Sequence, residues 1–581
     1  MNRFDSVFWS RLWTLARPYW QSERRLRALG LMALTLVLSA LILAGGIVFS
    51  YVARDMMTAL AERNGPVFFR TMALLVVYNL IAGPVVAIAG YVTGKLMLDW
   101  RQWLTERFLA TSFQDRTFYR ISGDTSIDNP DQRISEDVNT FVGFAVSFVT
   151  QVLQGVGTGA SFIVVLWLIS PFLALLLAVC VGGGSLLTIV IGRPLIGINF
   201  AQRRLEADFR YALVGVRDNA EAIALYGAER REHQALLQRL YAAIQNLHRL
   251  IARQRNLAYF TYGYDYLLPL IPVLALAPAF FAGTVEFGKI TQASAAFITL
   301  RASFSIIIDQ FNSLSSFAAV VERLGEYLEA ARGRPASDGR VEAFSVGEGG
   351  PMIETVEAAR LAIERLTLYT PDRRRILVRD LSLELTTAGH LLIVGESGVG
   401  KTSMLRAIAG LWRSGSGRIV RPPLSELMFV PQRPHMIAGS LRDQLGYPHA
   451  GAVTEEQLIA TLKLVSLDSL PRRIGGLDAH VKWEDLLSLG EQQQIAFARL
   501  LVNRPAYAFL DEATSALDTS REEALYGCLT SAGMRIVSVG DRIRLPRYHH
   551  TVLELLGDGG WRIITSDAPE SPSALTAEAD A

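Results

Sequence analysis

Apolar residues gather into long runs over the first 330 residues of the chain, and polar stretches separate these runs. A helix that crosses a bilayer needs about 20 largely apolar residues. Six runs meet this requirement: 28–51, 69–92, 141–169, 171–192, 257–282 and 292–318. The third and fourth runs meet at Ser170–Pro171, so their connection is very short. The pattern predicts an α-helical membrane domain with six transmembrane helices over residues 28–330.

The polar connections between the runs differ in length and charge. Residues 93–140 and 193–256 are long and helix-like, and the second segment is rich in arginine. The connections on the opposite side are short and contain few cations. Because basic residues collect on the cytoplasmic side of membrane proteins, we expect both long segments, both termini and the C-terminal domain to lie in the cytoplasm. A helical extension of about 25 residues reaches roughly 37 Å, far enough to contact a cytoplasmic domain.

Residues 1–27 combine aromatic rings with arginines, and the first apolar run begins only near Ala28. This pattern argues against a cleavable signal peptide. Aromatic rings suit the membrane interface, and arginines suit anionic headgroups. We interpret the segment as an amphipathic helix on the cytoplasmic membrane surface, with an ordinary soluble helix as the alternative. Its aromatic residues are Phe8, Trp9, Trp13, Tyr19 and Trp20.

The pattern changes after residue 330. Residues 331–357 contain glycine, proline and serine with little periodicity, which predicts a linker. Short apolar runs then alternate with helix-like segments over residues 358–566, as in an α/β domain. The predicted strands include 391–394, 428–430, 507–510 and 536–539. Residues 567–581 are poor in bulky apolar side chains, so we expect a disordered tail.

Composition and charge argue against a nucleic-acid partner, and the cysteine content argues against some kinds of site. Half of the 581 residues are hydrophobic, and the formal net charge is only +2. The mean hydropathy of +0.27 is high for a soluble protein. A nearly balanced charge creates no field for nucleic acid, so we expect no nucleic-acid partner. The two cysteines, Cys180 and Cys528, lie far apart, which argues against a disulfide framework or a zinc site.

A glycine-rich loop directly follows the predicted strand 391–394, in a strand–loop–helix context. Glycines let backbone N–H groups surround phosphate oxygens, and Lys401 adds positive charge near the β- and γ-phosphates. The Thr402 hydroxyl is suited to Mg²⁺, and the helix that follows points its positive end at the anion. The residues predicted to bind the phosphates of ATP are Gly395, Glu396, Ser397, Gly398, Val399, Gly400, Lys401, Thr402 and Ser403.

A second buried strand, 507–510, delivers two carboxylates. Asp511 is placed to bind Mg²⁺, and Glu512 follows at once, where it can polarise an attacking water. General-base assistance of this kind accelerates a reaction by about 10²–10⁴-fold. Two acids can also end a strand without any catalytic role, but the run Ala513–Asp518 continues the nucleotide-binding pattern.

Together these strings resemble an ATP-binding cassette (ABC) transporter over essentially the whole chain. Leu487–Glu491 resembles the cassette signature, and Ser515–Asp518 resembles the loop that crosses the dimer interface. Gln432 resembles the glutamine that links Mg²⁺ to the membrane domain. The resemblance implies an exporter-type scaffold with an α/β P-loop cassette, in a half-transporter that works as a C₂ homodimer. The signature residues implied to contact the ATP of the other copy are Ser488, Gly490 and Glu491.

Longer strings in the membrane domain narrow the resemblance. Residues 98–104, 117–120, 127–137 and 209–226 are similar to the SbmA/BacA group and to the peroxisomal subfamily D transporters. By resemblance, the turn at Asn129–Pro130 docks on a cassette. The SbmA/BacA-like group implies import of bulky hydrophilic cargo across the bacterial inner membrane, such as peptides, including antimicrobial peptides, or cobalamin-like solutes. A lipid or fatty acyl-CoA transporter of subfamily D type and an ATP-gated channel or receptor with weak hydrolysis stay as alternatives.

The chain departs from the family pattern at the γ-phosphate. Asp541 stands where the family has a histidine. Two like unit charges 4 Å apart repel by about 4 kcal/mol at an effective dielectric constant of 20, so we expect slow hydrolysis. By resemblance, the catalytic residues are Glu512, Lys401, Gln432 and Asp541, and the Mg²⁺ ligands are Thr402, Gln432 and Asp511.

Two further positions differ from the family or fit it incompletely. Leu489 replaces a glycine of the signature. Tyr369 is the nearest candidate for stacking on adenine, although an alignment on Pro371 puts Thr370 at that place. Tyr369 can equally be an ordinary strand residue.

Ionisable residues inside the predicted spans are candidates for function, because their burial in lipid is costly. Asp265 lies among tyrosines that include Tyr262, and Arg301 and Asp309 lie in the sixth run. One interpretation places these residues around a polar cavity for cargo. In the other, the tyrosines form an interfacial belt and the charges pair for structural reasons.

Overall fold

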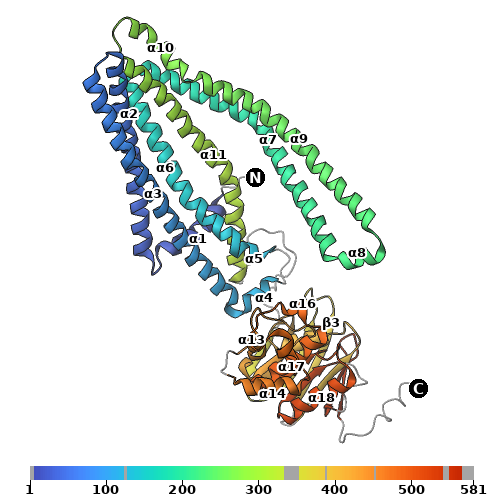
Figure 1. Cartoon of the computed structure of the whole chain (residues 1–581). Coiled ribbons are helices and arrows are strands. Elements are labelled where there is room, and N and C mark those ends of the chain that lie inside the picture. Colours follow the sequence, from blue (N-terminus) through green and yellow to red (C-terminus); the bar gives the residue numbers. More distant parts are fainter. Residues whose placement is uncertain are drawn as a thin grey trace. The chain divides into compact units, whose positions relative to one another are not determined.

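The computed structural model describes residues 5–122, 127–332, 352–385, 389–449, 453–540 and 548–565. The chain divides into two compact units, residues 1–339 and 340–581. In Figure 1 the described part of the first unit is helical and the described part of the second combines strands and helices.

The first unit is built from long helices that pack side by side. In Figure 1, α2, α3, α6 and α11 lie together, and α7 and α9 form a long pair joined through the short helix α8. The helices are α1 (Ser6–Trp20), α2 (Arg25–Ala61), α3 (Gly65–Phe113), α4 (Thr117–Ser122), α5 (Pro130–Gln132), α6 (Val138–Ile169), α7 (Pro171–Asp218), α8 (Ala220–Tyr226), α9 (Glu229–Leu267), α10 (Leu270–Phe281) and α11 (Phe287–Ala331). A 3₁₀ turn, η1 (Gln114–Arg116), and a π-helical turn, η2 (Arg133–Asp137), connect some of them.

Five helical segments of the described residues are long and apolar enough to cross a membrane. In each segment, only 11–28% of the apolar 18-residue stretch is buried within this one chain. Most of the apolar surface of these helices is therefore left for lipid or another subunit. The sixth predicted span, 292–318, lies on α11, where the side chains of 304–313 fall outside the described structure. This sixth span stays a prediction. The five segments are Arg25–Ala61, Gly65–Ser122, Pro130–Ile169, Pro171–Asp218 and Glu229–Phe281.

Two of these helices are much longer than a bilayer is thick, as the long polar connections predict. Helix α3 has 49 residues and α7 has 48, so each is about 70 Å long at 1.5 Å per residue. The hydrocarbon core of a bilayer is about 30 Å thick. Helix α6 ends at Ile169, and α7 begins at Pro171 after the single extended residue Ser170, which confirms the predicted short connection.

Helix α1 presents two different faces. Phe8, Leu15 and Tyr19 are buried, and the helix packs on α11. Trp9 and Trp13 are 59% and 63% exposed on the other face. This distribution agrees with an amphipathic helix, and its location at a membrane surface stays a prediction.

The described residues of the second unit form two sheets with four and six strands. Their orders are β1-β5-β2-β3 and β10-β9-β4-β8-β7-β6. All four strands predicted from the apolar runs are present, as β4, β6, β7 and β8. The strands are β1 (Ile353–Glu357), β2 (Leu361–Tyr369), β3 (Ile376–Leu385), β4 (Leu391–Gly395), β5 (Gly415–Arg421), β6 (Leu427–Val430), β7 (Tyr507–Asp511), β8 (Arg535–Val539), β9 (Thr551–Leu555) and β10 (Trp561–Thr565).

The structure corrects the predicted linker 331–357 at both ends. Helix α11 continues to Ala331, and residues 353–357 form strand β1. Strand β1 pairs in parallel with β5, more than 60 residues later in the chain. A strand that depends on so distant a partner leaves little local signal, because its hydrogen bonds are all supplied from elsewhere.

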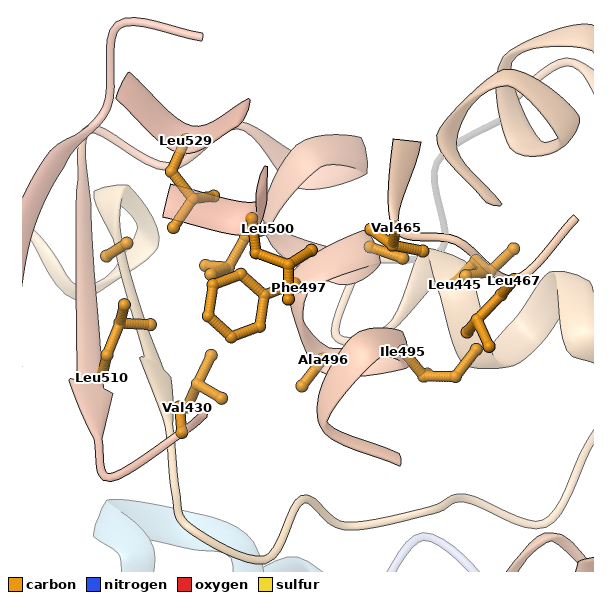
Figure 2. Close-up of a cluster of buried hydrophobic side chains, with 14 of the residues drawn as sticks. Val430, Leu445, Val465, Leu467, Ile495, Ala496, Phe497, Leu500, Leu510 and Leu529 are labelled. Carbon is orange, nitrogen blue, oxygen red and sulfur yellow. The ribbon is translucent and has the colours of Figure 1, made fainter. Parts of the chain in front are cut away.

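Helices cover the six-stranded sheet and complete its core. Figure 2 shows Phe497 of α17 among Val430 of β6, Leu510 of β7 and Leu529 of α18. Strands β9, β4, β8, β7 and β6 are parallel, so the carboxyl ends of β4 and β7 open on the same edge of the sheet. The helices of this unit are α12 (Lys401–Ile408), α13 (Leu441–Gly446), α14 (Glu455–Leu464), α15 (Leu470–Ile474), α16 (Trp483–Leu486), α17 (Leu489–Asn503) and α18 (Thr519–Ser531).

Candidate nucleotide-binding site

The glycine-rich loop lies between β4 and α12, as predicted. Gly395, Gly398 and Gly400 have φ of +148°, +78° and +118°, in the region that favours glycine. At Gly395 a Cβ atom would lie 2.6 Å from the carbonyl oxygen of Leu555 in the neighbouring strand β9. The loop therefore needs glycine at this position both for its backbone conformation and for close packing on the sheet.

Lys401 folds back over this loop. Its Nζ donates hydrogen bonds to the carbonyl oxygens of Gly395 and Glu396, at 2.7 and 3.0 Å. The ammonium group thus lies inside the curve formed by the loop, at the start of α12. This location suits the predicted contact of Lys401 with phosphate oxygens, because the N-terminus of α12 adds its own partial positive charge.

Two predicted metal ligands come together at the edge of the sheet. The Thr402 hydroxyl donates a hydrogen bond to Asp511 Oδ1 at 3.1 Å. Burial raises the pKa of the Asp511 carboxyl; the hydrogen bond from Thr402 opposes this rise, and the charge of Glu512 adds to it. A hydroxyl and a partly buried carboxylate are oxygen ligands of the kind that Mg²⁺ prefers. The residues present therefore fit the predicted ion.

Glu512 is held in an unusual backbone conformation directly after β7. Its φ is +48°, and its N–H donates to the carbonyl oxygen of Val539 at 3.0 Å. Gln432 Nε2 donates to Glu512 Oε2 at 3.1 Å. Gln432, predicted also as a metal ligand, is thus placed against the predicted general base. Residues with a strained backbone, such as Glu512, occur often at active sites.

The signature segment begins helix α17. Ser488 is the N-cap, and its hydroxyl accepts from the Glu491 N–H while Glu491 Oε2 accepts from the Ser488 N–H at 2.9 Å. Arg473 Nη1 donates to Glu491 Oε1 at 2.7 Å. Burial alone would raise the pKa of Glu491, but the hydrogen bonds from Arg473 and Ser488 lower it overall. Glu491 therefore fixes the conformation of Ser488, and its own contact with nucleotide stays a prediction.

Gly490 packs on the loop that follows Glu512. A Cβ atom at this position would lie 3.1 Å from the carbonyl oxygen of Ala516. Leu489, the residue that departs from the family signature, is 36% exposed. Helix α17 therefore carries the signature and also supports the loop 513–518.

Gln493 is a buried link that the sequence analysis missed. Its side chain is fully buried; Nε2 donates to the carbonyl oxygen of Gln432 at 3.0 Å and to Ser515 Oγ at 3.2 Å. Its Oε1 accepts from the Ala516 N–H at 3.1 Å. One side chain thus ties the Gln432 segment to the loop that resembles the dimer-crossing loop. The signal in the sequence is a run of three glutamines, 492–494, on an otherwise amphipathic helix.

The structure does not test the predicted roles of Tyr369 and Asp541. Tyr369 ends β2, and its carbonyl oxygen accepts from Trp412 Nε1 at 3.0 Å, which fixes its backbone but does not test stacking on adenine. Asp541 lies outside the described residues. His549 is buried and hydrogen-bonds to Ser538 Oγ at 2.9 Å, so its imidazole is held inside the domain.

In the first unit, three of the four predicted cargo residues come together. Arg301 Nε lies 2.5 Å from Asp265 Oδ1, and both residues line a hollow of about 330 Å³ that Tyr262 also lines. The remaining lining residues are Gln254, Leu257, Ala258 and Thr261. The side chain of Asp309 lies outside the described part of the chain. The ion pair is compatible with both interpretations of these charges, because a paired charge can also be structural.

Both units of the chain match known protein families, and full-length relatives are known. Residues 15–281 match the family described as ABC transporter transmembrane region 2, and residues 378–515 match the family described as ABC transporter. An uncharacterised ABC transporter ATP-binding protein of Synechocystis sp. is 44% identical over 92% of this chain and 81% of its own length. ABC transporter D family member 2, chloroplastic, of Arabidopsis thaliana is 38% identical over 97% of this chain and 89% of its own length. The lysosomal cobalamin transporter ABCD4 of Homo sapiens is 31% identical over 97% of both chains.

The fold has a counterpart among solved structures. A bacterial Atm1-family ABC exporter with ATP bound superposes with a TM-score of 0.70, covering 93% of this chain and 95% of that chain at 18% identity. The predicted combination of an exporter-type helical domain with an α/β cassette is confirmed. The chain therefore belongs to the ABC transporter family, as a half-transporter with relatives in subfamily D, whose ATP-binding cassette couples ATP hydrolysis to transport across a membrane.

Proposed function

We propose that the chain is a homodimeric, ATP-driven importer of bulky hydrophilic cargo, such as peptides or cobalamin-like solutes, in the bacterial inner membrane. The cassette and both termini lie in the cytoplasm. The observation that carries the cargo class is the hollow that Asp265 and Arg301 line together with the polar side chains of Gln254, Thr261 and Tyr262. The similarity to a cobalamin transporter supports the same class. Membership of the SbmA/BacA group stays a prediction from the sequence.

The nucleotide chemistry follows from the positions of the described side chains. Lys401 and the loop after Gly395 would hold the phosphates, and Thr402 and Asp511 would hold a Mg²⁺ ion, whose positive charge would offset the charge that develops on the transferred phosphate. Glu512 accepts a proton from the attacking water. Gln432, which donates to Glu512 Oε2, keeps that carboxylate oriented.

Each ATP site is completed by a second copy of the chain. Ser488 and Gly490 lie at the positive N-terminus of α17, a location suited to binding phosphate oxygens. In a C₂ homodimer the signature of each copy serves the phosphate loop of the other. Within one cassette, Gln493 connects two segments that serve different ATP sites. Gln432 belongs to the site of its own phosphate loop, and the loop at Ser515 lies beside the site that this cassette's signature completes.

Restoring a histidine at position 541 is expected to speed hydrolysis. The Asp541→His variant removes a negative charge that repels the γ-phosphate and supplies an imidazole donor. We expect a higher ATP turnover rate than in the native chain, measured with the full-length protein in liposomes. Asp541→Asn separates the two effects, because it removes the charge without adding the imidazole. ATP turnover in the native chain that equals or exceeds turnover in Asp541→His would contradict the prediction.

An alternative cargo class has its own supporting observation. A hollow of about 470 Å³ between α2 and α3 has an almost wholly apolar lining, which includes Phe49, Met56 and Leu75. Such a surface suits a lipid or acyl chain better than a peptide. An ATP-gated channel with weak hydrolysis is the third possibility.

Uptake into proteoliposomes distinguishes these functions. The full chain is reconstituted with ATP and tested with a panel of peptides, cobalamin and an acyl-CoA, beside a Glu512→Gln control. We expect peptide or cobalamin to accumulate against its gradient only with the native chain. Movement of acyl-CoA alone would support the lipid alternative, and downhill flux that persists in the control would support the channel.

A further inference from the structure

A group of charged side chains joins segment 127–137 to the end of helix α11. We name Asp128, Arg133, Asp137, Arg323 and Glu326 the charge clasp. The side chains of Arg133 and Asp137 are only 2% and 6% exposed. Burying charges is costly unless each has partners, so contacts of this kind constrain the two segments strongly.

Arg133 makes contacts in both directions. On its own segment, Nε donates to the carbonyl oxygen of Asp128 at 3.1 Å and Nη2 donates to Asp128 Oδ1 at 2.9 Å. Toward α11, Nη1 donates to the carbonyl oxygen of Arg323 at 2.6 Å and to Glu326 Oε2 at 3.4 Å. The planar guanidinium therefore bridges the turn and the helix with hydrogen bonds of fixed direction.

Arg323 and Asp137 form the second half of the clasp. Arg323 Nε and Nη2 donate to the two carboxylate oxygens of Asp137, at 2.7 and 2.5 Å. A bidentate pair of this kind fixes orientation as well as distance. Each segment therefore contributes one arginine to the other segment, which makes sliding of one past the other unfavourable.

The backbone of the turn is shaped for these contacts. Asn129 has a φ of +41°, and Arg133–Asp137 form a π-helical turn before α6. Single π-turns inside helices occur often at functional positions. Both Arg133 and Asp137 are directed at the same end of α11, as their bonds show.

The end of α11 is also fixed by two other elements, α1 and α3. Arg11 of α1 forms a bidentate pair with Glu329, at 2.9 and 3.0 Å. The hydroxyls of Ser112 and Tyr327 lie 2.5 Å apart. Helix α11 also carries Arg301, which lies before the charge clasp in the helix and lines the hollow of about 330 Å³, which we name the polar hollow. The helix ends at Ala331, and the next described strand is β1.

We propose that the charge clasp makes turn 127–137 and the end of α11 move as one body, with Arg133 and Arg323 as positioning residues for energy coupling. A displacement of the turn is then carried directly into α11 and so to Arg301. This inference rests on the sequence-based prediction, made by resemblance, that the Asn129–Pro130 turn docks on a cassette. It assigns the route by which ATP binding reaches the residues of the polar hollow.

Hydrogen–deuterium exchange in the full-length dimer tests the clasp. The protein is placed in lipid nanodiscs, with and without ATP and Mg²⁺, in a Glu512→Gln background that retains nucleotide. We expect ATP to change exchange both in residues 127–137 and in the end of α11. In Arg323→Gln the ATP-dependent change in α11 is expected to fall about tenfold, with the change in the turn retained. Arg323→Lys keeps the charge and is expected to restore much of the α11 response.

The controls separate the clasp from folding and from docking. Arg418→Gln breaks a more exposed pair with Glu354 in the cassette and is expected to leave both responses unchanged. Arg133→Gln, checked for thermal stability and dimer size, is expected to act like Arg323→Gln. An unchanged α11 response in both arginine variants, with a responding turn, overturns the clasp alone. A turn that does not respond to ATP in the Glu512→Gln background overturns the docking and the clasp together.

Discussion

Replacing Glu512 with glutamine is expected to lower ATP turnover by about 10²–10⁴-fold, the usual contribution of a general base. ATP binding is expected to stay close to native, because the change removes one charge while the side-chain volume is conserved. Glu512 accepts a hydrogen bond from Gln432 and is held at φ +48°, so the substituted side chain should keep its position. The measurement is phosphate release by the reconstituted full chain, with ATP binding measured in parallel.

A matched control uses a surface glutamate of the same cassette. Glu456→Gln changes an exposed residue in the first turn of α14 and is expected to hydrolyse ATP at the native rate. Native-like turnover in the Glu512→Gln variant would show that another group accepts the proton. Loss of ATP binding in that variant would instead indicate a structural role.

Replacing Gly395 with alanine is expected to abolish ATP binding and to destabilise the cassette. Backbone strain at φ +148° costs about 1–3 kcal/mol for a residue with a Cβ. The new Cβ would also lie 2.6 Å from the Leu555 carbonyl oxygen and 2.9 Å from Val399 Cγ1, and overpacking of this kind costs about 1–3 kcal/mol more. Since the loop cannot keep its shape, its N–H groups no longer surround the phosphates. ATP binding and thermal unfolding of the full chain measure both effects.

Gly527 provides the comparison for this prediction. It lies inside α18, where a Cβ would meet no atom within 4 Å outside the nearby backbone of its own helix, so Gly527→Ala is expected to be neutral or to stabilise by about 0.5–1 kcal/mol. If Gly395→Ala binds ATP as tightly as Gly527→Ala, the close approach to β9 does not shape the phosphate loop.

Several features of the site were predictable because their signals are local. The phosphate loop needs a strand before it, glycines within it and a helix after it, and these occur in unbroken order from Leu391 to Thr402. Asp511 and Glu512 follow a strand whose apolar run is unmistakable. The short connection at Ser170 was predictable because two apolar runs meet there at a proline.

Other features depend on partners that lie far away in the sequence. Arg133 and Arg323 are 190 residues apart, and Gln493 reaches back 61 residues to Gln432. Strand β1 lies in a segment with little periodicity, and its partner β5 lies more than 60 residues later in the chain. Sequence periodicity shows which face of an element is apolar but not which polar side chain will meet another.

The sequence by itself determined the apolar helices, four of the buried strands, the phosphate loop between a strand and a helix, and the two carboxylates at the end of a strand. These depend on residue type and near-neighbour spacing, which set backbone conformation and local charge. Only the tertiary structure decided how Gln493 joins two loops and how the charge clasp holds α11. It did so because a buried polar group is stabilised only by partners at hydrogen-bond distance, and those partners are fixed by packing.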